Sequence, residues 1–90
     1  MIKVGFPISM SLQNTLQSVL DGQDLVDVAE KVPLSFSTVK GLYYRSLDVT
    51  NTNQAAAFGL VNKAFEKATE NLAHFTKIKG ELEMILPKPV

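Results

Sequence analysis

Asp24–Leu47, with the sequence DLVDVAEKVPLSFSTVKGLYYRSL, is the stretch that decides the fold. Apolar residues recur at helical spacing on both sides of Pro33, which lacks a backbone N–H and predicts the end of a helix. Ser35 follows, and its hydroxyl can cap a second helix by accepting an unpaired backbone N–H. The stretch therefore predicts two short helices joined by a tight turn, which is a helix-turn-helix arrangement.

The first helix of this pair is expected to begin at Asp24, whose carboxylate can cap it. Asp27 adds negative charge near the positive end of the helix dipole. Ala29 is small enough to let a crossing helix approach closely. The residues expected to face inward are Leu25, Val28, Ala29 and Val32.

The second helix, from about Ser35 to Leu47, is expected to bury Val39 and Leu42 and to leave a polar and aromatic face outside. Aromatic rings, cations and hydroxyls on one exposed face are what a helix needs to read a DNA groove. An ordinary solvated helix face fits the spacing about equally well. The candidate DNA-binding residues are Ser35, Phe36, Ser37, Thr38, Lys40, Tyr44 and Arg45.

Ahead of this pair, residues 1–10 predict an N-terminal arm with a weak strand pattern, expected to lie on the core or on a partner. A first helix is expected from about Ser11 to Asp21. Ser9 or Ser11 can cap it, and Gly22 is expected to stop it in a left-handed conformation. Its apolar stripe consists of Leu12, Leu16, Val19 and Leu20.

The clearest pattern in the chain predicts a long helix from about Asn53 to Lys79. Its apolar residues recur by three and four, as the a and d positions of a coiled coil do over about three heptads. Such a helix outruns the three short ones, so we expect it to pack on the same helix of a second chain, although packing within one chain also fits. Gly80 is expected to break or bend it. The predicted dimer interface, called the seam below, consists of Phe58, Val61, Phe65, Ala68, Leu72 and Phe75, and Leu82 continues its pattern.

Length and composition set limits on the class of protein. The 90 residues predict a single all-α domain, with an arm at 1–10, a helix-turn-helix head at 11–50, a long dimerisation helix at 51–80 and a tail at 81–90. The absence of cysteine excludes disulfides and thiolate metal sites. Neither a signal-like start nor a membrane-length apolar run is present, so we expect a cytoplasmic protein without a membrane partner.

The net charge limits the kinds of partner that this chain is expected to bind. Nine basic residues balance nine acidic ones, which argues against a non-specific polyanion binder. Through residue 50 the chain has four Lys and Arg residues against five Asp and Glu residues. Because each neutralised phosphate contributes through released counterions, tight DNA binding would need both heads of a dimer.

The sequence offers no set of residues for catalysis. His74 is the only histidine, so no Ser/His/Asp constellation can be assembled without another base. No glycine-rich phosphate loop is present. The carboxylates of residues 21–30 lack the alternating spacing of a calcium loop and fit helix capping instead. We expect no enzymatic activity, no cofactor and no metal.

Leu16, Gly22, Ala29 and the block from Leu34 to Lys40, LSFSTVK, stand at a characteristic spacing. In these residues the central stretch resembles the LuxR/GerE-type DNA-binding domain. After a short deletion, residues 47–55, LDVTNTNQA, are similar to the family's run at the start of its fourth helix. The similarity covers about half the chain. It departs at Pro33 and Thr52, where the family usually has glycine and arginine.

This resemblance implies a four-helix domain whose third helix enters the major groove and whose fourth helix dimerises. By position, it implies that Lys40 makes the principal phosphate or base contact. The residues that it implies at the DNA are Phe36, Ser37, Thr38, Lys40 and Tyr44.

The leading hypothesis is therefore a homodimeric, sequence-specific regulator of transcription that binds double-stranded DNA with the helix from about Ser35 to Leu47. A second hypothesis is an adaptor or anti-regulator that uses the same helix-turn-helix scaffold to bind another regulatory protein. A third is a small oligomeric accessory subunit, as in transposases or phage packaging, with a DNA-binding head and a coiled coil.

Overall fold

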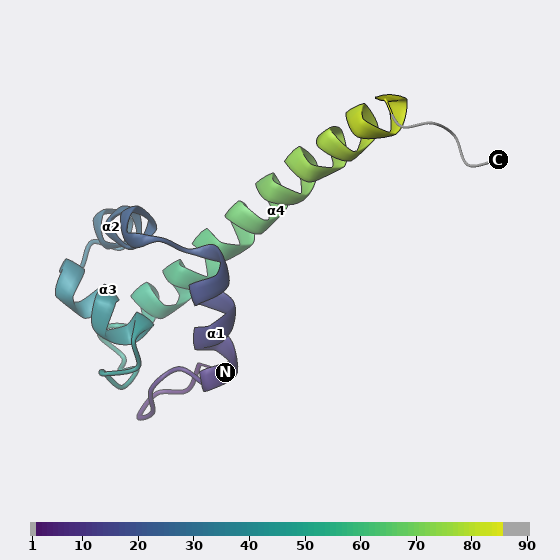
Figure 1. Ribbon diagram of the computed structural model, residues 1–90. Coiled ribbons are helices and arrows are strands. Elements are labelled where there is room, and N and C mark those ends of the chain that lie inside the picture. The colour runs from purple at the N-terminus through teal and green to yellow at the C-terminus, as the bar shows by residue number, and fades with distance from the viewer. Residues whose placement is uncertain (1, 86–90) are drawn as a thin grey trace.

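Three short helices pack around the first half of one long helix in the computed structural model, which describes residues 2–85 (Figure 1). The helices are α1 (Met10–Val19), α2 (Gly22–Lys31), α3 (Phe36–Tyr43) and α4 (Gln54–Ile85). The predicted all-α fold is confirmed. The second half of α4 projects beyond the other helices, and the molecule measures 58 × 24 × 16 Å. Among the described residues, no helix combines the length and apolarity needed to cross a bilayer.

The first helix begins where Ser9 caps it, since the Ser9 hydroxyl accepts a backbone N–H at 3.1 Å. It ends at Val19, earlier than expected, and Gly22 does not stop it in a left-handed conformation. Gly22 is instead the first residue of α2. The expectation was wrong because Asp21, which was assigned to the end of the first helix, is the N-cap of the next one.

A reciprocal capping box starts α2. Asp21 accepts the backbone N–H of Asp24 at 3.0 Å, and Asp24 accepts the backbone N–H of Asp21 at 2.9 Å. This arrangement pairs two amide donors that a helix start otherwise leaves unpaired. The prediction that Asp24 is the N-cap was therefore wrong by one turn. The helix ends at Lys31, shortly before Pro33, as the missing N–H of proline predicted.

The third helix begins as predicted and ends early. Ser35 is its N-cap and accepts the backbone N–H of Thr38 at 3.1 Å. The helix stops at Tyr43 rather than near Leu47. Arg45 follows with a φ of 62°, in the left-handed region that glycine usually occupies at this position.

Two backbone hydrogen bonds close the end of α3. Arg45 N–H donates to the Leu42 carbonyl at 3.2 Å, and Ser46 N–H donates to the Gly41 carbonyl at 2.9 Å. This is the pairing of a Schellman motif, which satisfies carbonyls that the helix leaves free. Leu47 then folds back over Gly41, where an added Cβ would lie 2.6 Å from the leucine side chain. The glycine gives Leu47 room to close the motif, which explains why the helix is shorter than its apolar pattern.

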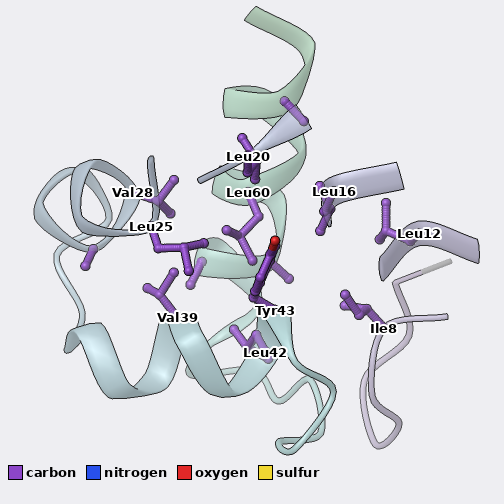
Figure 2. Packing of buried hydrophobic residues seen from close by; sticks show 14 of the residues in the cluster. Ile8, Leu12, Leu16, Leu20, Leu25, Val28, Val39, Leu42, Tyr43 and Leu60 are labelled. Atoms are coloured by element: carbon purple, nitrogen blue, oxygen red, sulfur yellow. The ribbon is translucent and has the colours of Figure 1, made fainter. Parts of the chain in front are cut away.

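The N-terminal arm lies on the chain's own core, one of the two locations expected for it. Residues 2–9 contain no strand. Val49 holds the arm through two backbone bonds: it accepts the Gly5 N–H at 2.7 Å and donates its own N–H to the Phe6 carbonyl at 2.8 Å. Ile8 is completely buried. The arm and the loop between α3 and α4 are thus fastened side by side (Figure 2).

The core lies where the three short helices meet the start of α4 (Figure 2). Leu60 of α4 is fully buried among side chains of the other helices. Gly59 allows α2 to approach, because a Cβ there would lie 3.0 Å from the methyl groups of Val28 and Val32. The buried face of α4 consists of Ala56, Ala57, Leu60 and Ala64, which are not the residues of the seam.

The long helix is continuous through Gly80 and reaches Ile85, so the expectation of a break was wrong. Nothing lies within 4 Å of a Cβ built on Gly80, and no neighbour forces a bend there. A glycine inside a helix costs only about 1 kcal/mol relative to alanine. At the other end, Thr50 and Asn53 bind each other reciprocally at 2.7 and 3.2 Å just before the helix starts.

Candidate functional site

Four of the seven candidate DNA-binding residues lie together on the outer face of α3. Phe36, Ser37, Lys40 and Tyr44 are all exposed and stand at i, i+1, i+4 and i+8, so that they share one side of the helix and its C-cap. Phe36 is 43% exposed and Tyr44 52%. This set is called the α3 face below, and it combines two aromatic rings, a hydroxyl and a cation.

Ser35 and Thr38 form the cap at the start of α3. Their hydroxyl oxygens lie 2.8 Å apart, and the Ser35 oxygen also accepts the Thr38 backbone N–H. Part of the hydrogen-bonding capacity of both hydroxyls is therefore used inside the protein. Their effect on a ligand would come mainly through the geometry of the helix start.

Arg45 lies apart from the α3 face. Its Nε donates to the backbone carbonyl of Ile8 at 2.7 Å, and the side chain is partly buried. One guanidinium donor is thus engaged in holding the N-terminal arm. A contact of this kind joins residues far apart in the chain, and the helical spacing that suggested an outward Arg45 contains no signal of it.

Tyr43 supports the α3 face from below. It is buried, and its ring meets the ring of Tyr44 edge-on with centroids 4.8 Å apart. Burial, with smaller contributions from Tyr44 and Asp21, raises the pKa of Tyr43. The contact between the two rings is visible only once both side chains are placed, and helical spacing alone contains no signal of it.

Lysines of α4 match the acidic side of α2. Lys67 lies 2.6 Å from the buried carboxylate of Asp24 and 3.8 Å from Asp21. Lys63 lies 3.5 Å from Asp27. Three of the carboxylates that made the head acidic in sequence are thus paired with cations that come from outside the head segment. The excess of negative charge counted through residue 50 does not describe the folded head.

The same contacts shift the pKa values of Asp24 and Lys67. Burial alone would raise the pKa of Asp24, but the hydrogen bond from Lys67 and the backbone N–H of Asp21 lower it below its ordinary value. The hydrogen bond to Asp24 raises the pKa of Lys67. Both groups are therefore charged at neutral pH, and the pair joins the start of α2 to α4.

Two grooves flank α4. The larger, of about 420 Å³, lies between α2 and α4 and has Val28, Val32 and Gly59 in its floor, with Lys31 and Glu66 among its charged residues. The smaller, of about 220 Å³, lies between α1 and α4 and is lined almost wholly by apolar side chains. Within residues 2–85, no group of three or more His, Cys, Asp or Glu side chains is arranged to hold a metal ion.

Most of the seam is exposed to solvent. Phe65 is 72% exposed, Leu72 69% and Phe75 64%. Phe58 and Ala68 are also exposed, whereas Val61 packs partly against the core. Large apolar side chains in a row on one helix indicate a surface that another molecule covers.

Comparisons with protein-family models, with curated proteins and with solved structures gave no match to this chain.

Proposed function

We propose that this protein is a dimeric, sequence-specific regulator of transcription that reads the major groove of double-stranded DNA with α3. The observation that carries the proposal is the α3 face, which presents Phe36, Ser37, Lys40 and Tyr44 outward after a short turn from α2. The resemblance of the segment from Leu34 to Lys40 to the LuxR/GerE-type domain supports the same function.

The chemistry of the α3 face suits base and phosphate recognition. The Lys40 ammonium can donate to a phosphate or to the acceptor edge of guanine. The Ser37 hydroxyl can donate or accept at a base edge, and the Phe36 ring offers an apolar contact for a thymine methyl group. Tyr44, whose ring Tyr43 holds edge-on, presents a phenol group at the end of the same face.

The distribution of charge is compatible with a modest affinity for each head. The ion pairs of Lys63 and Lys67 offset carboxylates of α2, while Lys40 remains exposed on α3. Few cations per head mean few released counterions, so two heads acting together are needed for tight binding. Two heads bound to one duplex would recognise a pseudo-palindromic site.

The proposal is tested by fluorescence anisotropy with a randomised duplex pool at low salt. Lys40→Ala should weaken binding to all duplexes by about tenfold, since one charged contact contributes on the order of 1–2 kcal/mol. Tyr44→Ala should change the sequences selected from the pool. Lys77→Ala, which removes a cation from an exposed position outside the head, is the matched control and should leave binding unchanged. Absence of any complex with the wild-type chain would refute the proposal.

A second candidate function is binding of another protein by the same α3 face. It is favoured by the exposure of Phe36 and Tyr44 and by the net charge of zero, because protein interfaces are enriched in aromatic residues and depleted of charge. The dependence of binding on salt concentration distinguishes the two functions. DNA binding should fall steeply as ionic strength rises, whereas binding of a protein through aromatic residues should change little.

A further inference from the structure

The unpaired part of α4 has one apolar side and one charged side. We call residues 68–85 the rod. Leu72, Phe75 and Leu82 lie along its apolar side and are exposed. Glu70, Lys77 and Glu81 lie on the opposite side, at helical spacing from one another. Lys79 interrupts the apolar side and Met84 lies on the charged side, but the three large apolar residues still form one continuous exposed strip, which favours a covering partner.

We propose that the rod of a second copy of this chain covers it in an antiparallel arrangement, with Phe65 of each chain opposite Leu82 of the other. The tip of each rod then reaches the apolar groove between α1 and α4 of its partner. This inference specifies the dimer of the proposed function and does not require DNA to be the ligand of α3.

Complementary side chains favour the antiparallel direction. Reversing one helix puts each a position opposite a d position, because the two layers alternate along both helices. The resulting pairs are Phe65 with Leu82, Ala68 with Lys79, and Leu72 with Phe75. Phe65 and Phe75 then each meet a leucine, and the long Lys79 side chain meets the small Ala68. A parallel pair would instead oppose two Lys79 ammonium groups and two small Ala68 side chains in the same seam.

Lys79 has a partner for its charge on its own helix. Its ammonium lies 3.9 Å from the Glu83 carboxylate on the same helix. A lysine can lay its methylene stem over an apolar neighbour while its charge stays in water. The stem would cover Ala68 of the partner, and Glu83 would keep the charge at the edge of the interface.

The groove between α1 and α4 fixes the register. Leu12, Leu16 and Val19 of α1 line it together with Ala64, Phe65 and Ala68 of α4. It lies where the rod leaves the head, and α1 runs beside α4 at this point (Figure 1). In the proposed register residues 82–85 of the partner run level with residues 65–62, so the end of its rod lies beside this groove. Moving the partner helix by one heptad in one direction would bring Val61 into the interface, but the core of its own chain already covers Val61 in part. Moving it by one heptad in the other direction would leave Phe65 uncovered.

The area and the charges agree with a second copy as the occupant. From their exposed fractions, Phe65, Leu72 and Phe75 together would withdraw on the order of 400 Å² per chain from water, about half of the ~800 Å² that a stable interface buries on each partner. The flanks and the groove supply further contact. A helix that lies on a lipid surface needs a polar side rich in lysine and arginine, whereas Glu70 and Glu81 make the charged side of this rod mixed.

Cysteine cross-linking without DNA tests the inference, since the full chain contains no cysteine. Ala68→Cys and Lys79→Cys variants, one of them tagged, are mixed and oxidised in a glutathione buffer. We expect a mixed disulfide between the two variants and little product from either one alone. Ala73→Cys replaces Ala68→Cys as a control on the opposite side of the helix and should not cross-link. Homodisulfides formed by each variant alone, or no disulfide in the mixture, would overturn the proposal.

A spin label at Met84→Cys, combined with light scattering, gives a second measurement on the full chain. Met84 is 88% exposed, so the label should not disturb packing. An antiparallel dimer separates the two labels by about 30 Å, because about twenty residues of helix lie between the two levels. A parallel dimer would hold them within about 20 Å, since packed helix axes lie only about 10 Å apart. The shorter distance or a monomeric mass would contradict the inference, and neither result would bear on DNA binding by Lys40.

Discussion

At the scale of single residues, Asp24 joins the start of one helix to the side of another. Its carboxylate accepts the Asp21 backbone N–H within the capping box and also binds Lys67 of α4. The sequence indicated a capping aspartate here, and that much of the local structure was predictable. The partner was not, because Lys67 is far away in the chain and only the crossing of α2 with α4 brings it close.

Because of this ion pair, the free energy of unfolding depends on pH. Because the folded-state pKa of Asp24 lies below its ordinary value of 3.8, the charged form is favoured by folding. The stability that it contributes is present above that value and is lost as the pH falls through the lowered pKa. Asp24→Asn should cost about 1 kcal/mol at neutral pH, a modest figure because the lysine end of the pair is solvated.

Urea unfolding at about pH 7 and about pH 2 measures this effect. The difference in unfolding free energy between wild type and Asp24→Asn should shrink in acid, since the wild-type carboxylate becomes neutral there too. Glu30→Gln changes an exposed carboxylate of the same helix and is the matched control. A difference between wild type and Asp24→Asn that stayed constant over this range would contradict the assignment.

At the scale of helices, the sequence predicted the number and order of the elements but not which side of α4 packs inward. The seam was found because Phe65, Leu72 and Phe75 are large, and large residues dominate a periodic pattern. The face that enters the core is made mostly of alanine, which packs closely but leaves a weak pattern. The early end of α3 was missed for a related reason, since Arg45 occupies a left-handed position that sequence rules assign to glycine.

Gly80 provides a test of the continuity of α4. Because the helix passes through Gly80 with nothing packed beside it, Gly80→Ala should stabilise the rod locally by about 1 kcal/mol. Helical ellipticity should rise and amide exchange near residue 80 should slow, while the melting temperature of the head stays nearly constant. Gly80→Pro is the opposing variant and should lower the ellipticity. No change in exchange with either substitution would indicate that α4 does not extend through this position in solution.

At the scale of the whole molecule, the chain divides into a packed head and an extended rod. The core made by the three short helices and the first half of α4 accounts for folding. The rod contributes little to that core, because its apolar residues are exposed. The sequence predicted this division from the length of the helix alone. It did not predict the grooves on either side of α4, since each is formed by residues from two helices.

This division predicts that the proposed dimer can be dissociated without unfolding the head. Phe75→Glu places a charge in the seam, where burial in a dimer would leave it without a partner. The variant should be monomeric by light scattering at concentrations where the wild type is dimeric, and its thermal unfolding should match that of a wild-type chain diluted to monomer. Lys77→Glu lies on the charged side and is the matched control. A dimeric Phe75→Glu variant would show that the seam is not the interface.

The ion pair of Lys67 with Asp24 has a mechanical consequence. It is the last salt bridge between α2 and α4 before the long helix leaves the head, so it lies where the rod begins. The rod extends about 27 Å past Lys67. Because the helix is continuous, a small change in the angle at which α4 leaves the head would displace its far end much farther than its base.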